Sequence, residues 1–381
     1  MAKNKNDLTD DLSTAIAGAI NDKFKATSRT KTAYFLDGDD DAPTIAKEFV
    51  SSGSSILDLI ISNRKHGGFP VGRISEISGL EQSGKSLLAA HILLNTQRAG
   101  GLGVFIDTEM ATSKEYMEAI GINLKELLHI PLETVEDVFE TIDIIIARVR
   151  KQNKNRLVTI VVDSVAGVST KTEMEADFDK DGYATAKSII ISKAMRKITN
   201  EIGREKICLI FTNQLRQKLN AMPFSDPWIT PGGKAIPFHS SVRIRLNSVG
   251  QIKVKDGSRN EIVGAKVKAK IVKNRIGPPQ RECEYNIYFD SGIDDYGSWL
   301  EVLKQCDYIT SSGAWFTWEH PETKESIKFQ TKEFVDMLNN DPKIKELMYD
   351  QICEKYIKKY KNSTSIPENV EYSQYNDEND M

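Results

Sequence analysis

The segment GLEQSGKS at residues 79–86 is the feature that most constrains how this chain can fold. It matches the pattern GxxxxGK[ST], it follows the strand-like run GRISEIS, and it precedes the apolar helical run SLLAAHILL. A glycine-rich turn between a strand and a helix directs backbone N–H groups and the positive end of the helix dipole at one point. Because this arrangement binds phosphate oxygens, the segment predicts a phosphate-binding loop.

This loop is expected to bind ATP and a Mg²⁺ ion. Lys85 has the length to reach the β- and γ-phosphates and to take part in catalysis, and the Ser86 hydroxyl is placed to hold Mg²⁺. Asp163 closes the apolar run LVTIVVD and is expected to bind the same ion directly or through water, although an aspartate there can instead cap the next helix. The expected nucleotide-binding residues of the loop are Gly79, Leu80, Glu81, Gln82, Ser83, Gly84, Lys85, Ser86 and Leu87.

Short apolar runs alternate with helical segments between residues 71 and 288, which predicts an α/β fold with a mostly parallel sheet covered by helices. Four of these runs are GRISEIS, GVFIDTE, LVTIVVDS and ICLIFTNQ, and each ends in polar residues. Since ligands bind at the carboxyl ends of parallel strands, these ends are expected to share one site. Glu109 at such an end can activate a water molecule or favour a helix dipole. Gln214 can sense the γ-phosphate or make an ordinary strand-end hydrogen bond.

The pattern changes after residue 233. The runs SVRIRLNSV and GAKVKAKIVKN alternate between apolar and polar residues on either side of the turn signal KDGS. They predict an antiparallel extension of the sheet, so that a nucleotide-binding core spans residues 46–294. Residues 295–362 are expected to form a small C-terminal α+β domain. Residues 363–381 carry acidic but no basic side chains, which predicts a disordered tail.

Residues 1–45 are expected to form an oligomerisation arm. Leu12, Ile16, Ile20 and Phe24 recur at helical spacing within residues 7–25, and the apolar run TAYFLD that follows predicts a short strand. A helix and a lone strand cannot bury their apolar side chains by themselves, which favours docking on another subunit. Packing of the helix on its own domain fits the spacing equally well.

Composition narrows the remaining possibilities. The 381 residues have a net charge of −3, so no strongly basic average indicates nucleic acid and any such contact must be local. The four cysteines are far apart and form no CxxC pair, which argues against a zinc site or a disulfide scaffold and is typical of a reducing cytosol. Without a signal-peptide pattern or a run of about 18 apolar residues, we expect a cytoplasmic protein with no membrane contact.

A larger set of motifs resembles the RecA recombinase family. These motifs follow one another in the order of that family, over roughly residues 40–330: GLEQSGKS, VFIDTEMA, IVVDSVAGV, AMRKI, IFTNQLRQK, TPGGKA, KIVKNRIGPP and SGAWFTW. The N-terminal arm, the loops and the short C-terminal region resemble the bacteriophage-type, or UvsX, branch. The resemblance implies a RecA-like P-loop ATPase core that uses ATP and Mg²⁺ in the cytoplasm of a bacterium or of a phage-infected host.

The resemblance also implies an activity and partners. Members of the family form helical filaments on single-stranded DNA, hydrolyse ATP in a DNA-dependent manner, pair the bound strand with a homologous duplex and exchange strands. These reactions serve recombination, DNA repair and the SOS response to DNA damage. The implied partners are single-stranded DNA, homologous double-stranded DNA, further copies of the chain, and single-strand-binding or loading proteins.

Three residues of the expected active site gain roles through the resemblance. Glu109 matches the glutamate that positions the hydrolytic water. Tyr116 matches the tyrosine that stacks on adenine, although the family's aspartate three positions earlier is Ser113 here. Gln214 matches the glutamine that is proposed to couple the γ-phosphate to the DNA loop.

Three further positions match subunit contacts of the family. Lys273 and Arg275 match a basic pair that reaches the ATP of the adjacent subunit, in the manner of an arginine finger. The pattern alone indicates only a solvated strand end at these two residues. Phe238 resembles an interface phenylalanine, and a core aromatic explains it nearly as well.

Two loops of the family carry DNA. The first is expected at about residues 175–187, where the sequence EADFDKDGYATA is acidic and suits phosphate contacts poorly. The family's arginine at its end aligns with Ile189, and Lys187 is the candidate in its place. Arg196, in the motif AMRK, matches another basic DNA contact.

The second loop is expected at residues 215–234 and contains the stretch NAMPFSDPWITPGG. The prolines and glycines of this stretch interrupt helices and strands, so the stretch is expected to stay unstructured until DNA arrives. Cations near phosphates and apolar side chains between bases hold single strands without reading sequence. The candidate DNA-binding residues of this loop are Arg216, Lys218, Met222, Phe224, Trp228, Gly232, Gly233 and Lys234.

Two alternatives stay open at this point. A hexameric RecA-fold DNA helicase shares the core fold and the binding of ATP between subunits, but the arm and the loop after NQLR favour a filament. A non-catalytic recombination mediator is the other alternative. The intact set of Lys85, Ser86, Asp163 and Glu109 argues against it.

Overall fold

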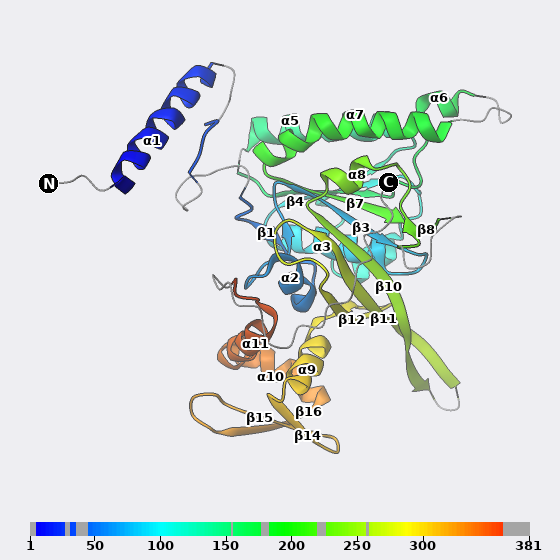
Figure 1. Cartoon of the computed structure of the whole chain (residues 1–381). Helices are drawn as coiled ribbons and strands as arrows, with labels where there is room; N and C mark the ends of the chain where they lie inside the picture. The colour runs from blue at the N-terminus through cyan, green and yellow to red at the C-terminus, as the bar shows by residue number, and fades with distance from the viewer. Residues whose placement is uncertain are drawn as a thin grey trace.

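The computed structural model describes residues 5–26, 31–35, 45–153, 155–176, 183–218, 226–256 and 259–360. A nine-stranded sheet forms its centre, with the strand order β13-β12-β11-β10-β3-β7-β6-β4-β5 (Figure 1). The neighbouring strands from β10 to β5 run parallel to one another. Their bounds are Val242–Asp256 (β10), Arg73–Gly79 (β3), Ile207–Gln214 (β7), Val158–Asp163 (β6), Leu102–Asp107 (β4) and Leu127–Pro131 (β5). The predicted α/β fold with a mostly parallel sheet is confirmed.

The four strands predicted from apolar runs are β3, β4, β6 and β7, and they lie side by side. β6 is buried at every residue and β7 at all but its last. Strands covered on both faces have nearly unbroken apolar sequences, which is why β6 and β7 were recognisable in the sequence. Their carboxyl ends reach the same edge of the sheet, with Asp107 beside Asp163 and Gly79 beside Gln214.

An antiparallel extension follows the parallel strands, as the alternating runs predict. β10 pairs with β11 (Arg259–Asn274), and β12 (Glu282–Tyr288) and β13 (Gly292–Asp294) continue the sheet. Because β10 pairs with β3 only over residues 242–246, its second half and the facing part of β11 form a two-stranded ribbon. This ribbon projects from the body of the molecule (Figure 1).

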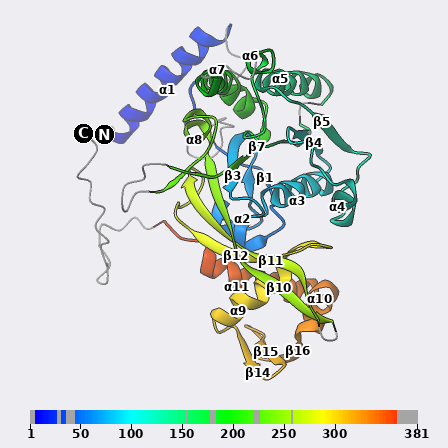
Figure 2. The ribbon, with the colours of Figure 1, turned by 90° about the vertical axis from the view of Figure 1, so that its right-hand side faces the viewer.

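Helices cover both faces of the sheet (Figure 2). The helices of one face are α5 (Val135–Gln152), α7 (Tyr183–Arg204) and α8 (Ala235–His239), and those of the other face are α2 (Ser55–Ser62) and α3 (Lys85–Arg98). Two short helices, α4 (Lys114–Ala119) and α6 (Lys171–Met174), lie in the loops that follow β4 and β6. A separate two-stranded sheet, missed in the sequence, pairs β1 (Phe49–Val50) with β2 (Phe69–Pro70).

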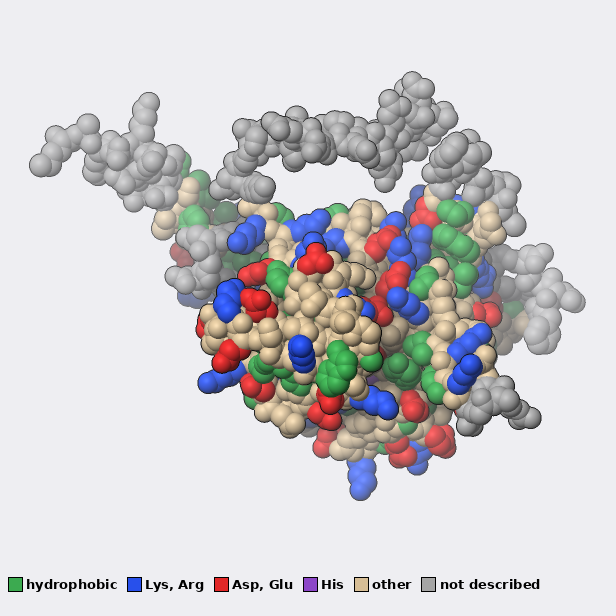
Figure 3. Space-filling view, turned by 90° about the horizontal axis from the view of Figure 1, so that it is seen from below, with side chains coloured by type: hydrophobic (Ala, Val, Ile, Leu, Met, Phe, Trp, Pro, Cys, Tyr) green, Lys and Arg blue, Asp and Glu red, His purple; other side chains and the backbone are tan. Residues whose placement is uncertain are grey.

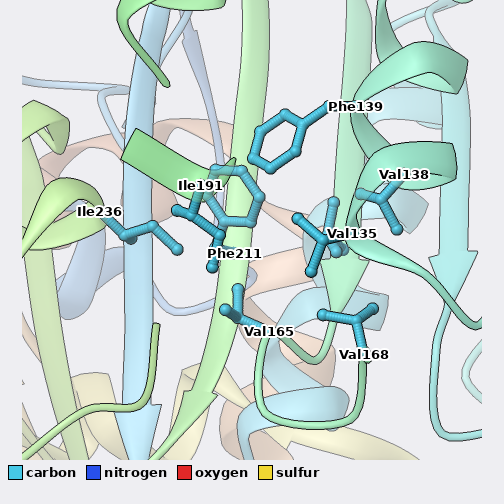
Figure 4. Close-up of a pocket in the computed structure, with 9 residues that line it drawn as sticks. Val135, Val138, Phe139, Val165, Val168, Ile191, Phe211 and Ile236 are labelled. Atoms are coloured by element: carbon cyan, nitrogen blue, oxygen red, sulfur yellow. The ribbon is translucent and has the colours of Figure 1, made fainter. Parts of the chain in front are cut away.

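An apolar cluster fills the space between the sheet and the helices α5, α7 and α8 (Figure 4). Phe139 from α5, Ile191 from α7, Phe211 from β7 and Ile236 from α8 converge there with Val165. The gap between them has a volume of about 10 Å³, and every residue that lines it is apolar, so it stays dry. The loop that leaves Asp163 contributes Val165 to this cluster. The packing therefore fixes the helices next to Asp163.

Residues 295–356 form a small α+β unit, as predicted, at the bottom of Figure 1. Its elements are α9 (Asp295–Gln305), β14 (Ile309–Ser312), β15 (Trp315–Glu319), β16 (Ser326–Gln330), α10 (Thr331–Asn340) and α11 (Pro342–Tyr356). α9 and α11 contact α2, so one hydrophobic core continues from the sheet into this unit. On the face that Figure 3 shows, Lys and Arg side chains are interspersed with Asp and Glu, without a broad basic patch among the residues described there.

The N-terminal helix α1 (Lys5–Phe24) lies apart from the rest of the chain (Figure 1). Leu12 is 62% and Ile16 is 50% exposed, so the apolar stripe of this helix is not packed on its own domain. The short strand predicted in TAYFLD is wrong for residues 31–35, which form no strand. The Asn21 side chain instead binds the backbone of Thr32 and Ala33 over 2.7–3.1 Å.

The cysteines and the length of the apolar helices can be compared with the sequence expectations. All four cysteines are free, and Cys208, Cys283 and Cys353 are buried. Within the described ranges, no helix combines the length and the apolar character needed to cross a membrane. The predicted acidic tail, residues 363–381, lies outside the described residues.

Replacing Ile191 by Ala is expected to lower the free energy of unfolding by about 2–5 kcal/mol, because it opens a cavity in the cluster of Figure 4. The matched control is Ile189→Ala on the same helix, whose side chain is 51% exposed. That surface change is expected to stay within about 0.5 kcal/mol of the wild type. Urea unfolding followed by circular dichroism measures both variants, and equal losses for the two would contradict this packing.

Candidate active site and nucleic-acid interface

The predicted phosphate loop joins β3 to α3 and is built around two glycines. A Cβ atom at Gly79 would lie 2.2 Å from Ser83 Oγ and 2.8 Å from the carbonyl oxygen of Leu246. Gly84 has a φ of +88°, and a Cβ atom there would lie 3.0 Å from Ile287 Cδ1. Since only glycine fits at these positions, the backbone turns tightly and α3 begins with its free N–H groups at the loop.

Lys85 is the first residue of α3, and its ammonium group points back into the loop. Its Nζ donates a hydrogen bond of 2.7 Å to the carbonyl oxygen of Leu80. Burial lowers the pKa of Lys85, while Asp163 and Glu109 act in the opposite direction. A phosphate group in the loop would give this half-buried cation a stronger partner than a carbonyl oxygen.

Asp163 ends β6 beside the phosphate loop. Its side chain is 7% exposed and accepts hydrogen bonds from Ser86 and, at 2.5 Å, from Thr212 Oγ1. Burial raises the pKa of Asp163, and the two hydrogen bonds oppose this effect. The contact brings together the two residues predicted to hold Mg²⁺. Asp163 does not cap the next helix, because Thr170 caps α6.

Glu109 lies in the turn after β4, next to Asp163. Its carboxylate accepts a hydrogen bond from the hydroxyl of Ser164. The turn itself is fixed by Asp107, whose Oδ1 accepts from the amides of Glu109 and Met110 at 3.1 and 2.8 Å. Glu109 is therefore held on a rigid turn. The nearest following helix, α4, begins only at residue 114, so the helix-dipole interpretation of Glu109 does not apply.

Asp107 is a site residue that the sequence reasoning missed. Burial acts to raise its pKa, but hydrogen bonds from Thr112, His129 and two backbone amides outweigh burial and lower the pKa. Asp107 thus stays ionised next to the candidate catalytic carboxylate. The signal was present in the sequence, because Asp107 closes the apolar run GVFID just as Asp163 closes LVTIVVD.

A pocket of about 190 Å³ extends from these carboxylates to α4. Tyr116 lines it with Leu87 and Phe105, and burial raises the pKa of the Tyr116 hydroxyl. Ser113, which replaces the family's aspartate, caps α4 by accepting a hydrogen bond of 3.2 Å from the Tyr116 amide. A phosphate loop, two strand-end carboxylates and an aromatic wall thus lie around one pocket. The residues present fit a nucleoside triphosphate with Mg²⁺.

Gln214 connects this site to the second predicted DNA loop. It ends β7 directly beside Gly79 in the parallel register, and the amide of Leu215 donates to the Gly79 carbonyl oxygen at 3.0 Å. Within the described part of the chain, no hydrogen bond of the Gln214 side chain is found, so the ordinary strand-end hydrogen bond is not observed. The side chain is half-buried at the start of the loop.

The base of the second predicted DNA loop is ordered. β8 (Arg216–Gln217) pairs with β9 (Trp228–Ile229) in an antiparallel ladder. Asp226 forms an ion pair with Arg245 of β10, with an Nη2–Oδ2 distance of 2.5 Å. The expectation that the whole loop is unstructured is therefore wrong for its base, because the two short strands satisfy each other's backbone groups.

The DNA-binding candidates of this loop occupy different places. Trp228 is half-buried in β9, and Met222 and Phe224 lie outside the described residues. Gly232 and Gly233 have φ values of +91° and +76°, which glycine adopts without strain, and they turn the chain into α8. The basic candidates are all exposed: Arg216, Lys218 and Lys234.

The first predicted DNA loop is shorter than expected. Residues 183–187 belong to α7, and residues 177–182 lie outside the described residues. Lys187 is half-buried, and its Nζ donates to the carbonyl oxygens of Val168 at 2.6 Å and Ala166 at 3.4 Å. Burial lowers the pKa of Lys187. Arg196 is exposed on α7, where it donates to Ser192 at 2.9 Å, and its DNA contact stays a prediction.

Lys273 and Arg275 lie away from the phosphate loop of their own subunit. In the register of the sheet, Lys273 is opposite Arg243, and Arg243 is opposite Glu76 in the middle of β3. Arg275 lies further from the carboxyl edge, and its amide donates to Ser241 at 2.9 Å. The basic pair is therefore two strands away from β3 across the sheet. Along the strands, it lies further than the phosphate loop from the carboxyl edge.

The surroundings of Lys273 include the end of α8. Its Nζ donates to the carbonyl oxygens of Pro237 and Phe238 at 2.8 Å each. Burial, followed by the charges of Arg275 and Arg243, lowers the pKa of Lys273 to about 8. The Phe238 side chain is 66% exposed, so the core-aromatic interpretation of this residue is wrong.

Comparison with known proteins assigns the family. A family model described as the RecA N-terminal domain matches residues 16–294. The chain is 36% identical over 301 residues to Protein RecA of Rubrobacter xylanophilus, across 74% of this chain and 83% of that protein. It is 34% identical over 315 residues to Protein RecA of Crocosphaera subtropica, across 83% and 85% of the two chains. The chain therefore belongs to the RecA family of recombinases.

Proposed function

We propose that the chain forms helical filaments on single-stranded DNA, hydrolyses ATP in a DNA-dependent manner, and catalyses homologous pairing and strand exchange. The observation that supports this proposal is the separation of two groups of residues that the resemblance assigns to one nucleotide site. Glu109 and Asp163 lie at the carboxyl edge of the sheet. Lys273 and Arg275 lie two strands from β3, which leads into the phosphate loop, and further from that edge. At about 3.3 Å per residue and about 4.8 Å per strand, roughly 14–19 Å separates the basic pair from the start of the phosphate loop.

A separation of this size favours two copies in head-to-tail contact, rather than one copy, as the carriers of the two halves of one ATP site. Such heterologous contacts build rings or open helical filaments. The exposed apolar stripe of α1 and the exposed Phe238 supply side chains for a contact of this kind. The RecA names of the relatives favour the filament over the ring.

Hydrolysis is proposed to use the carboxyl edge of the sheet. Mg²⁺ bound with ATP would offset phosphate charge, and Ser86 and Asp163 would hold it. Lys85 would bind the β- and γ-phosphates in place of the carbonyl oxygen that it contacts now. Glu109, oriented by Ser164, is placed to accept a proton from the attacking water.

Single-stranded DNA is proposed to bind at the loop that begins after Gln214. Exposed cations surround its base, and Trp228 offers a ring on which a base can stack. Because Gln214 lies beside the phosphate loop, it is the proposed link between ATP and DNA. The assignment to the bacteriophage-type branch, the loading partners and a role in the SOS response are proposals that rest on the sequence resemblance.

Strand exchange between circular single-stranded DNA and homologous linear duplex DNA is the direct test. Joint molecules and nicked circles are expected for the wild type, and none for Lys85→Ala. Electron microscopy with single-stranded DNA and ATPγS distinguishes the proposed filament from the helicase alternative. Closed rings instead of helical filaments would overturn the proposal. Absence of DNA-stimulated ATP hydrolysis would favour the non-catalytic mediator instead.

Replacing Glu109 by Gln is expected to lower the DNA-stimulated kcat by at least about 100-fold, because the amide cannot accept a proton from water. ATP binding and single-stranded DNA binding are expected to remain. Glu115→Gln is the matched control, since Glu115 is exposed on α4 near the same pocket. Steady-state ATPase and nucleotide-binding assays measure both variants. Turnover of Glu109→Gln close to that of the control would reject the proposed role.

Replacing Trp228 by Ala is expected to weaken single-stranded DNA binding by about 1–3 kcal/mol, the value of one base–aromatic stack. Trp315→Ala serves as the control, because Trp315 is 48% exposed on β15 of the C-terminal unit. Fluorescence anisotropy of a labelled oligonucleotide with ATPγS measures the affinity at one fixed salt concentration. Equal affinities for the two variants would place the stacking elsewhere.

The basic pair predicts a pH dependence. Lys273 has a pKa lowered to about 8 by burial and by its basic neighbours, so its positive charge is present below that pH and is lost above it. The kcat/KM for DNA-dependent ATP hydrolysis is expected to fall as the pH rises through about 8. Lys273→Arg keeps its charge and is expected to remove this alkaline limb. A limb that stays unchanged in Lys273→Arg would show that another group causes it.

A further inference from the structure

One buried carboxylate in the sheet has no part in the site described above. Glu76 lies in β3 and is 0% exposed. Its Oε2 accepts a hydrogen bond from Arg243 Nε at 2.5 Å, and its Oε1 accepts one from Asn213 Nδ2 at 3.1 Å. Burying a charge is unfavourable even when it is paired, and apolar replacements of such pairs are often as stable. Stability alone therefore does not account for this pair.

Asn213 connects Glu76 to the base of the DNA loop. Its Nδ2 also donates a hydrogen bond of 3.1 Å to the carbonyl oxygen of Pro231. Because both partners are acceptors, the amide nitrogen must face them. Its Oδ1 is then buried without a hydrogen-bond partner among the residues that the structure describes. An unsatisfied buried oxygen is unfavourable, so this orientation is explained by the connection between Glu76 and Pro231.

The other end of this connection reaches the basic pair. Arg243 is opposite Lys273 across the β10–β11 ladder, which places both side chains on the same face of the sheet. Burial and the neighbouring arginines lower the pKa of Lys273, and Glu76 acts in the opposite direction. Lys273 is also held by carbonyl oxygens of α8, the helix that follows Pro231. The loop base and Lys273 are therefore joined twice, through α8 and through the side chains of Asn213, Glu76 and Arg243.

We propose that Glu76 is a positioning residue that transmits the state of the DNA loop to Lys273. This inference rests on the proposed function, because it assumes that DNA binds the loop and that Lys273 acts on the neighbouring subunit's ATP. DNA that displaces Pro231 changes the hydrogen bond of Asn213. The Glu76–Arg243 pair then shifts, and with it the position and charge environment of Lys273. Glu76 itself touches no substrate, and its path is separate from Gln214, which lies at the phosphate loop of the same subunit.

The variant Glu76→Gln tests this inference in the full-length protein. It keeps the size of the side chain but has one acceptor oxygen, so it cannot accept from Arg243 and Asn213 on separate oxygens. Ser75→Ala is the matched control, because Ser75 is the preceding residue and its buried hydroxyl has no hydrogen-bond partner among the described residues. ATPase rates are measured with and without single-stranded DNA, together with the pH profile of kcat/KM and the melting temperature.

For Glu76→Gln we expect a DNA-free ATPase rate and a KM for ATP within twofold of the wild type. The DNA-stimulated kcat is expected to fall at least tenfold, while affinity for single-stranded DNA stays within threefold. The alkaline limb of kcat/KM is expected to move to lower pH, because the negative charge that raises the pKa of Lys273 is gone. Ser75→Ala is expected to match the wild type in every measurement.

Two results would overturn the inference. One is wild-type DNA stimulation in Glu76→Gln, and the other is an equal loss of DNA-free and DNA-stimulated rates with a lower melting temperature, which indicates a structural role alone. If Glu76→Gln does not fold, Arg243→Lys keeps the charge but lacks the Nε donor, and the same selective loss of stimulation is expected. A wild type without any DNA stimulation would overturn the proposed function itself, so the two failures are distinguishable.

Discussion

The parallel alignment of β3, β7, β6 and β4 is the constraint on which the rest of the structure depends. Both faces of these strands are buried, so a slip of one residue would turn apolar side chains of the core toward the wrong layer. With the register fixed in this way, all four strands end at one edge of the sheet. Gly79, Asp107, Asp163 and Gln214 meet there although they are distant in the sequence. The phosphate loop, the carboxylates and the predicted DNA loop are neighbours because the strands that carry them are neighbours.

The same sheet carries polar groups where packing alone would favour apolar ones. Asp163 and Glu76 are buried carboxylates, and Lys85 is a half-buried cation whose pKa is lowered by burial. Asp163 and Glu76 accept hydrogen bonds from neighbouring strands, and Lys85 donates one to the phosphate loop, which limits the unfavourable effect of burial. Proteins tolerate such local conflicts mainly where function needs them. These groups are concentrated between the carboxyl edge and Lys273, in the part of the fold that contains the candidate site.

The sequence predicted those features whose signals are local. The phosphate loop, the four central strands and the alternating ribbon each carry their pattern within a few consecutive residues. Features that depend on distant partners were missed or misplaced. Lys187 looks like an exposed loop lysine, but its partners are carbonyl groups of the loop after β6. Asp226 at the loop base forms an ion pair with Arg245, which lies on another strand 19 residues later. The described part of TAYFLD, residues 32–35, forms no strand, because a strand needs a partner and a local pattern carries no information about one.

If the nucleotide site is divided between two copies, as proposed, DNA binding is tied to assembly. If DNA at the loop shifts α8, it also shifts the carbonyl groups that hold Lys273, because Gly232 and Gly233 connect the loop to that helix. ATP held by Lys273 of a neighbouring copy must then bias the loop in return, since coupling between two binding sites is reciprocal. Thermodynamically, DNA affinity, ATP affinity and the contact between copies become parts of one equilibrium. Under the proposed division, a single copy would carry only half of each ATP site, and the coupled unit would be the pair of neighbours rather than the chain alone.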